Sequence, residues 1–368
     1  MEATRDRRYD AREDTPPLVA RAARADARAQ RRLQAAIDDL FMCDEYRLDE
    51  RTRTRLAAQL RGLVQTVEEQ IAADAARLLK ARGATALSDT LVETTGSVLG
   101  RLLDSGLLRD PELIAELVAR VRVTLIAAAL PIATGQPDQP SLLARLTQAP
   151  DRIVAHAALT LLIAEARRVD TGDERVEELE LPPALHARLV WRAAAALRDR
   201  AASGPATDRE LLDRALSDAA ERSLAALDEG ERADMVAMRL AAAIDAQADE
   251  IEIMLAESLA DRRLPLFIAL LAHSLGVSFA LARETVLDPD GDRLTLALRS
   301  LGLRRAAIAR IGLSLCEADR RRGLERLVAQ LDSLDELDDE VARTAIAPLR
   351  LHPDYRAALL ALDRRGGR

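Results

Sequence analysis

The chain has 368 residues, of which 49% are hydrophobic but only 2% aromatic, and its formal net charge is −8. A core with so few aromatic residues must be built from Leu, Ala, Ile and Val, which favours packed helices over sheets. The excess of acidic residues argues against nucleic-acid binding, because proteins of that class usually carry net positive charge. Lys80 is the single lysine among 53 basic residues, and we attribute this arginine bias mainly to the base composition of the coding sequence.

Cysteine usage and hydropathy indicate the compartment. Cys43 and Cys316 are far apart and have no His or Cys at ligand spacing, so the sequence predicts neither a disulfide framework nor a zinc site. The N-terminus has no apolar signal region, and apolar stretches such as 123–133 fall well short of the roughly 18 residues that span a bilayer. We expect a cytoplasmic protein without a membrane anchor, a cofactor or a metal.

Charge alternation marks the beginning of the chain. Residues 1–17 alternate Arg with Asp or Glu and end in Pro16-Pro17, which predicts a disordered tail. An N-terminal helical region is expected over 18–135. After it, the stretch PIATGQPDQP at 131–140 concentrates Pro, Gly and Asp and is the best candidate for a domain boundary. A helical-repeat region is expected over 141–365.

The longest predicted helix runs from about Asp49 to Arg82. Its apolar positions step by three or four residues and form one stripe: Leu56, Leu60, Leu63, Val67, Ile71, Ala75 and Leu78. Gly83 is expected to end the helix. The stripe predicts a helix packed on the core, and a partner-facing or homodimerising helix is the alternative.

The residues Asp110-Pro111-Glu112 predict the start of a second helix. Asp caps free N–H groups, Pro fits the first helical position, and the negative charge of Glu is favourable near the positive end of the helix dipole. This helix is expected to run to about Leu130. Nowhere does the chain show alternating strand patterns bounded by hairpin turns. The predicted fold class is all-α.

The stretch LAHSLGVSFALARE at 271–284 looks like a helix-turn-helix unit. A shift of 26 residues, however, places Ser274, Leu275, Gly276 and Ala280 on Ser300, Leu301, Gly302 and Ala306. Two such units in succession indicate a stacked helical repeat, in which each Gly takes the left-handed turn that ends a helix. The helix after Gly276 also presents Phe279 to Ala282 where a DNA reader needs Arg, Asn or Gln, with only Arg283 suitably placed. A DNA-binding regulator acting through 271–284 is kept as the alternative.

Candidate chemistry is sparse. DPDGD at 288–292 fails as a calcium loop, because Gly is fourth instead of sixth and Arg299 occupies the twelfth position. His156, with Thr160 one turn on, is expected to be a buried or half-buried His bonded to backbone, and a phosphorelay His is the third hypothesis. Gly-rich phosphate loops, GxSxG and HExxH are absent from the sequence. We expect no enzyme activity and no catalytic residues.

Three stretches carry a family resemblance: 259–311, LPPALHARLVWRAAAALR at 181–198, and GRLLDSGLLRDPELIAELV at 100–118. They resemble a bacterial family known only as a domain of unknown function, all-helical and similar to HEAT-type repeat proteins. The resemblance covers most of residues 90–320 and rests on packing residues and turn glycines. It implies a superhelical fold and a regulatory or scaffolding role, with no catalytic residues to transfer.

The predicted architecture is an α-α superhelix of stacked antiparallel, HEAT-like helix pairs, with a separate N-terminal helical bundle. Such arrays offer long grooves, and their usual work is to bind another protein. We therefore expect a non-catalytic scaffold for protein–protein interaction, with a regulatory or signalling role and a partner that the sequence does not identify. The candidate contact residues are Arg304, Arg305 and Arg310 on the repeat helices.

Overall fold

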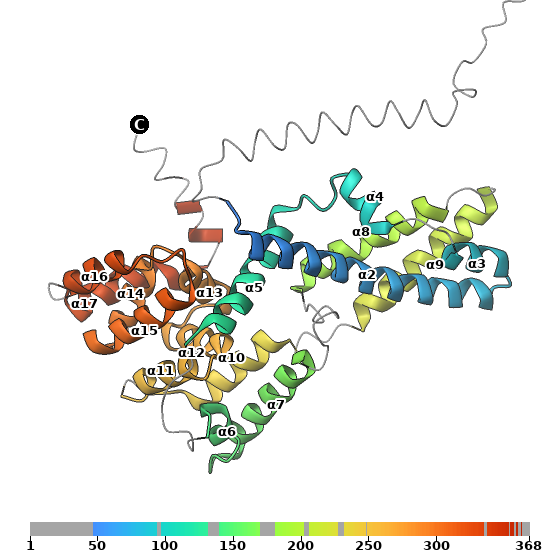
Figure 1. The fold of residues 1–368 in the computed structure, drawn as a ribbon. Helices are drawn as coiled ribbons and strands as arrows, with labels where there is room; N and C mark the ends of the chain where they lie inside the picture. Colours follow the sequence, from blue (N-terminus) through green and yellow to red (C-terminus); the bar gives the residue numbers. More distant parts are fainter. Residues whose placement is uncertain are drawn as a thin grey trace, which may run out of the picture. The chain divides into compact units, whose positions relative to one another are not determined.

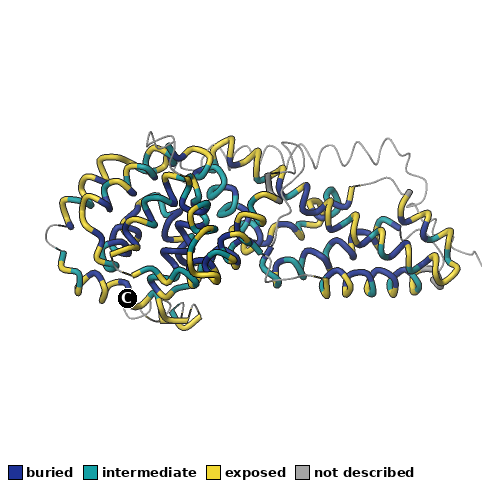
Figure 2. The backbone as a smooth tube through the Cα atoms, turned by 90° about the horizontal axis from the view of Figure 1, so that it is seen from below, coloured by how far each residue is buried: buried dark blue, intermediate teal, exposed yellow. Residues whose placement is uncertain are grey.

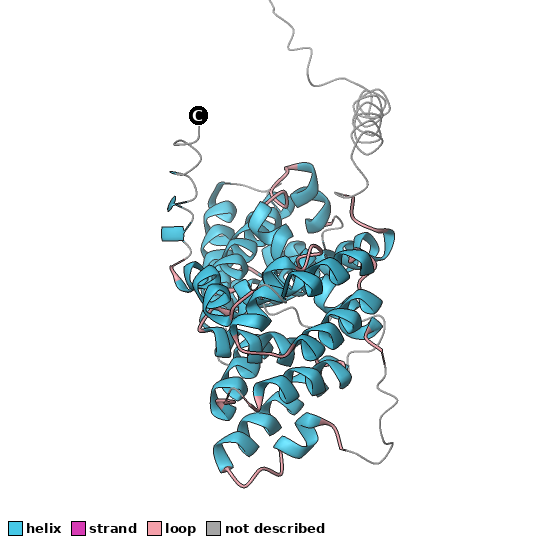
Figure 3. Cartoon of the chain, turned by 90° about the vertical axis from the view of Figure 1, so that its left-hand side faces the viewer, coloured by secondary structure: helices cyan, strands magenta, loops and turns pink. Residues whose placement is uncertain are grey.

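The structure is a computed structural model that describes residues 47–93, 97–131, 140–169, 181–201, 206–226, 232–247, 249–334, 337–352, 354–356, 358, 359 and 362. Within these ranges the chain forms helices and turns and no strand (Figure 3), which confirms the all-α class. No single helix in the described ranges has both the length and the hydropathy to cross a membrane. The predicted tail at 1–17 and Cys43 lie outside the described residues.

The chain divides into two compact units, Met1–Arg53 and Thr54–Arg368. In the described part of the first unit, Asp49 caps the start of a helix. Its Oδ1 accepts a hydrogen bond from the Thr52 amide at 2.9 Å, and its Oδ2 accepts one from the Thr52 hydroxyl at 2.6 Å. Burial would raise the pKa of Asp49, but these hydrogen bonds outweigh it and lower the pKa. Asp at this position satisfies amides that the helix itself leaves free.

The long predicted helix is confirmed as α2, Glu50–Ala81. Its inward face is buried at intervals of three or four residues, with Val67, Ile71 and Ala75 at most 2% exposed. The predicted stop is also confirmed, because Gly83 has a φ of +78°. The next amide, that of Ala84, donates back to the carbonyl of Leu79 at 2.9 Å, which closes the last turn.

A first core joins helices from both sides of the predicted boundary at 131–140. It is formed by α2, the N-terminal half of α5, and the helices α3 (Thr85–Glu93), α4 (Val98–Asp104), α8 (Pro183–Ala201) and α9 (Ala206–Ala225). Leu, Ala and Val fill it. Figure 2 shows the result as buried stretches that recur on one side of each helix, as amphipathic helices require.

A second core surrounds α12, Leu264–Leu275, whose residues are buried on nearly every side. Figure 1 shows α10 and α11 lying beside it. α10 packs on α7, and α14 packs on α17. The helices of this region are α6 (Leu142–Leu146), α7 (Arg152–Val169), α10 (Ala233–Ile244), α11 (Ile251–Ala260), α12, α13 (Phe279–Leu287), α14 (Asp292–Ser300), α15 (Arg305–Ala318), α16 (Leu324–Ser333), α17 (Asp339–Ile346) and the short 3₁₀ helix η4 (Ala347–Arg350).

The two cores interleave along the sequence. Helix α5, Pro111–Ala129, belongs to both, since Leu113 and Leu117 pack in the first core and Ile126 in the second. The chain then contributes α6 and α7 to the second core and returns to the first with α8 and α9. The packing of helices into the two cores does not follow their order in the chain, and the division into 18–135 and 141–365 stays a prediction. A Pro- and Gly-rich stretch predicts where helices end but does not specify which helices pack together.

The two glycine turns share one geometry. Gly276 has a φ of +67° and Gly302 a φ of +81°. The residue after each glycine donates its amide to the carbonyl five positions back, Val277 to Ala272 at 3.0 Å and Leu303 to Leu298 at 3.2 Å. This pattern is a Schellman turn, which requires the left-handed conformation that glycine adopts without strain.

Two arginines that lie further along the chain donate hydrogen bonds to the C-terminal carbonyls of α12 and α13. The Nε of Arg350 donates to the carbonyl of Leu275, the last residue of α12, at 2.9 Å. The Nη2 of Arg321 donates to the carbonyl of Leu287, the last residue of α13, at 3.3 Å. The final carbonyls of a helix lack intrahelical partners, and a guanidinium on a long arm can reach them. These arginines therefore have a structural role.

Candidate functional site

An open groove of about 1090 Å³ runs between α5, α8 and α13, and we call it the α5–α13 groove. Its apolar lining combines small and larger side chains: Ala115, Val118, Ala119, Pro182, Ala184, Leu185, Ala280, Leu281, Leu287 and Pro289. Its charged lining consists of Glu112, Glu116, Glu284, Asp288 and Asp290 with Arg122, Arg188, Arg283, Arg293 and Arg356. The groove thus combines an apolar surface with charges of both signs.

Glu116 fixes one wall of the groove to another. Its carboxylate receives both terminal nitrogens of Arg283 from α13, with Nη1 at 3.0 Å from Oε1. The Nε of Arg120, one turn further along α5, lies 2.6 Å from Oε1. All three side chains are at most 15% exposed, so the ion pairs are shielded from solvent. This bidentate arrangement is the strongest geometry available to a carboxylate and a guanidinium.

The titration of Glu116 reflects these contacts. Burial by itself would raise its pKa, since it disfavours the charged form. The hydrogen bond from Arg283 and the positive charges of Arg120 and Arg283 outweigh burial and lower the pKa to about 2. Glu116 is therefore ionised throughout the neutral range and has no proton to exchange there, which suits a structural anchor better than an acid-base catalyst.

A second set of ion pairs joins α5 to α8. The predicted helix start is confirmed, because Asp110 accepts hydrogen bonds from the amides of Glu112 at 3.1 Å and Leu113 at 3.3 Å. Asp110 also lies 3.0 Å from Arg188 and 2.9 Å from Arg192, both on α8. Burial opposes ionisation of Asp110, yet the amide and the two arginines outweigh it and lower its pKa. The residue that caps α5 therefore also holds α8 against α5 through two ion pairs.

The helix-turn-helix-like stretch forms one wall of this groove. α12 and α13 meet at 116°, within the range of helix-turn-helix units. Leu281, Ala282 and Thr285 of α13 are buried, and Arg283 is held by Glu116. The residues of this wall that remain exposed include Ala280 and Glu284, which offer little to a base edge or a phosphate.

Residues 136–347, more than half of the chain, match a family described as an uncharacterised protein conserved in bacteria, DUF2336. The chain belongs to the DUF2336 family. No curated protein and no solved structure shows significant similarity to it. The DUF2336 region contains two walls of the groove, α8 and α13, whereas the third, α5, precedes it.

Within the DUF2336 region, the three predicted contact arginines are already engaged in ion pairs. Arg304 is 81% exposed but binds Glu252 through its amide and through its side chain, with Nη2 at 2.6 Å. Arg310 lies 3.8 Å from the same carboxylate. Arg305 binds Asp332 at 2.9 Å. These arginines lie outside the α5–α13 groove, and Arg310 lines a separate hollow of about 370 Å³ between α11 and α15.

The histidines do not gather into one site in the described residues. His156 is exposed on α7, so the expectation of a buried or half-buried His is wrong. The helix turns its Val154, Ala158 and Leu161 face to the core, which leaves His156 on the opposite side. His273 makes a 2.9 Å contact with Asp245, and neither group lies near His156 in the sequence. Because His156 is exposed, the phosphorelay hypothesis stays a sterically allowed prediction.

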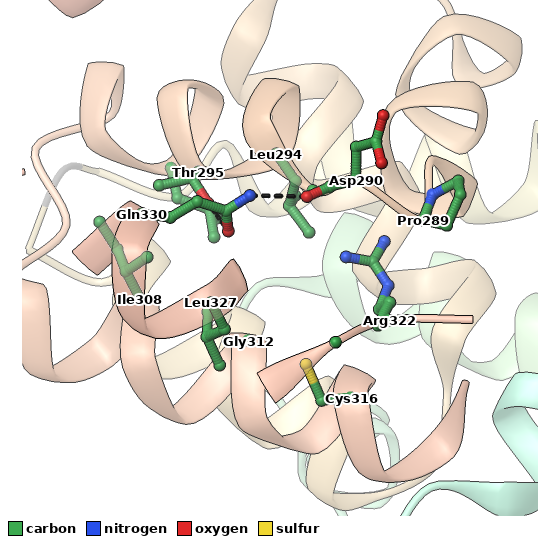
Figure 4. A pocket seen from close by; sticks show the side chains of 13 residues that line it. Pro289, Asp290, Leu294, Thr295, Ile308, Gly312, Cys316, Arg322, Leu327 and Gln330 are labelled. Carbon is green, nitrogen blue, oxygen red and sulfur yellow. Dashed lines mark hydrogen bonds between the residues drawn. The ribbon is translucent and has the colours of Figure 1, made fainter. Parts of the chain in front are cut away.

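The DPDGD stretch forms the turn between α13 and α14 beside a small cavity of about 20 Å³, room for one water molecule (Figure 4). Gln330 donates 2.6 Å hydrogen bonds to the carbonyl of Asp290 and to Asp292 Oδ1, which closes the turn. Burial raises the pKa of the Cys316 thiol in this cavity, which disfavours the reactive thiolate. Across the described residues, no group of three or more His, Cys, Asp or Glu side chains is arranged to hold a metal ion.

Sequence reasoning identified Asp110 but missed the residues that build the groove. The Glu116–Arg120 pair was visible in principle, because it has the i, i+4 spacing of a helical ion pair. The contact of Glu116 with Arg283 spans 167 positions and leaves no local signal. The groove therefore emerges only from the packing of α5 against α13.

Proposed function

We propose that this DUF2336 protein is a non-catalytic cytosolic scaffold that binds a partner protein in the α5–α13 groove. The observation that supports this most directly is the groove itself, which combines about 1090 Å³ of open volume with an apolar surface and a charged border. Small-molecule sites usually measure about 300–1,000 Å³ and enclose most of their ligand. A larger, open, alanine-rich groove suits a macromolecular segment better.

The groove is large enough for a short helical segment. A helix with short side chains is about 10 Å across and rises about 1.5 Å per residue, so the groove equals roughly nine residues of helix in volume. An amphipathic helix laid in an apolar groove is a recurring mode of protein recognition. The charged border would then set orientation and partner choice more than affinity.

The repeat interpretation stays part of this proposal. The matching turns at Gly276 and Gly302 support two successive helix–glycine–helix units. A continued stack of such pairs would form the HEAT-like superhelix that we expect from the sequence, and its concave surfaces would be natural partner sites.

Site-specific photocrosslinking tests the groove. A photoreactive amino acid would replace Ala280, which is exposed in the groove, or Ala329, which is exposed on α16 outside it. In host cells we expect a discrete adduct to a host protein from position 280 and none from position 329. Equal adducts from both positions, or none from position 280 in a folded variant, would refute the groove as the binding site.

DNA binding through 271–284 is the second candidate, favoured by the 116° angle between α12 and α13. It predicts affinity for duplex DNA that falls steeply as salt rises. The exposed Glu284 on α13 weighs against it, because a carboxylate on the helix that would face DNA repels phosphate. Fluorescence anisotropy with labelled genomic fragments over a salt series decides the matter, since the scaffold proposal predicts no salt-dependent binding.

A further inference from the structure

Helix α7 presents an apolar face that no described residue covers. The helix packs on α10 and α6, and Figure 1 shows it at the margin of the second core. On its outward side Ile153 is 71% exposed, and Leu159 and Ile163 are each 47% exposed. Together with the exposed Leu162 they form an apolar patch on the order of 400 Å², and a patch of that size on a single chain usually marks an interaction site.

The residues of this face are arranged symmetrically along the helix. Ile153 and Ile163 lie five residues on either side of Ala158, and His156 and Thr160 lie two residues on either side of it. At about 100° per residue, these four positions fall within about 80° of one another around the helix. An antiparallel second copy of α7 centred on the same position would therefore place Ile153 opposite Ile163, and His156 opposite Thr160, with each contact made twice.

The two polar residues of the face are complementary to each other across such an axis. The hydroxyl of Thr160 donates its hydrogen to the carbonyl of His156 at 2.8 Å, so its oxygen is left as an acceptor. His156 is exposed, and its ring has no partner among the described residues. A ring N–H of His156 can therefore donate to Thr160 of the second copy. A purely apolar partner would leave both polar groups unsatisfied, which costs binding free energy.

We propose that α7 is a self-association surface, on which two copies of this protein pair antiparallel about a two-fold axis beside Ala158. Two such patches bury on the order of 800 Å² of apolar surface, at the low end for specific interfaces, so the dimer should dissociate in the micromolar range. The proposal is independent of the proposed function, because α7 contributes no residue to the lining of the α5–α13 groove. A dimer would carry two such grooves, and a partner with two matching segments would bind it more tightly than a single chain.

Sedimentation velocity of the full chain over a concentration series tests the surface. We expect a reversible monomer–dimer equilibrium in the wild type. Ile153→Lys and Ile163→Glu, made singly, should each raise the dissociation constant by about tenfold or more, because each places a charge against an apolar side chain. Val328→Glu is the matched control, since Val328 is 50% exposed on α16, and it should leave the constant unchanged. A wild type that stays monomeric, or an equal loss of dimer in the control, would overturn the proposal and leave the face to a different partner.

A charge swap tests the antiparallel arrangement. With Ile153→Lys and Ile163→Glu in the same chain, the introduced lysine faces the introduced glutamate of the second copy at both ends of the interface. The dissociation constant should return to within about threefold of the wild type and, unlike that of the wild type, should rise with salt. A parallel pair would instead bring like charges together. A folded double variant that stays monomeric, or a recovery that salt does not affect, would overturn the proposed pairing.

Discussion

Replacing Glu116 by Gln removes the carboxylate that joins α5 to α13. The pKa of Glu116 is about 2 against its ordinary 4.5. A difference of about 2.5 in pKa, at about 1.4 kcal/mol for each, gives about 3 kcal/mol of stabilisation at neutral pH. Loss of one partner from a buried ion pair costs a similar amount, about 3–5 kcal/mol, because the remaining charge is left unpaired. Glu116→Gln should therefore lower the free energy of unfolding by about 3 kcal/mol in urea denaturation at pH 7.

The destabilisation caused by Glu116→Gln should become smaller as the pH falls. The folded-state pKa of Glu116 is lowered, so the stabilisation is fully present above pH 4.5 and is lost as the pH falls towards 2. The difference between wild type and Glu116→Gln should fall from about 3 kcal/mol at pH 7 to about 1.5 kcal/mol at pH 3.

A matched control lies in the same groove. Glu284 binds Arg293 at 3.2 Å, but both side chains are more than half exposed. Glu284→Gln should change stability by about 0.5 kcal/mol or less, because solvent screens such a pair. If Glu116→Gln has no larger effect than this control, or if its effect does not diminish on acidification, the ion-pair argument is wrong.

Three further predictions, one of them with a control substitution, test the fold and the contact residues. Gly276→Ala should cost about 1 kcal/mol in chemical denaturation, because a residue with a side chain is strained at a φ of +67°. Gly100→Ala, inside α4 and without a positive φ, should be neutral or stabilising, and equal effects would refute the turn argument. Asp110→Ala should cost at least about 2 kcal/mol, because it removes both the helix cap and the ion pairs with Arg188 and Arg192, and a cost below about 0.5 kcal/mol would show that neither stabilises the fold. Arg304→Glu should lower the melting temperature, because it places a second carboxylate beside Glu252; an unchanged melting temperature would mean that their 2.6 Å contact does not stabilise the fold.

Local patterns in the chain are enough to predict individual helices and turns. α2 and the start of α5 follow from apolar spacing and from one capping residue, Asp110. The turns at Gly276 and Gly302 follow from the absence of a side chain. In each case the decisive interactions connect residues within one or two helical turns, so the pattern in the chain and the contact in space coincide.

The assignment of these helices to two cores, and the groove between α5, α8 and α13, could not be predicted from local patterns and became visible in the folded structure. α8 and α9 pack in the first core, and Arg283 contacts Glu116 across 167 positions. Many other pairings of amphipathic helices would bury apolar faces equally well, so the sequence does not single out these contacts. The exposed position of His156 was not predictable for the same reason: when a helix is apolar on most sides, its sequence does not specify which face packs on the core. Apolar burial is non-directional, so the sequence specifies that helices pack but not which helices contact one another. The groove results from those specific contacts between helices.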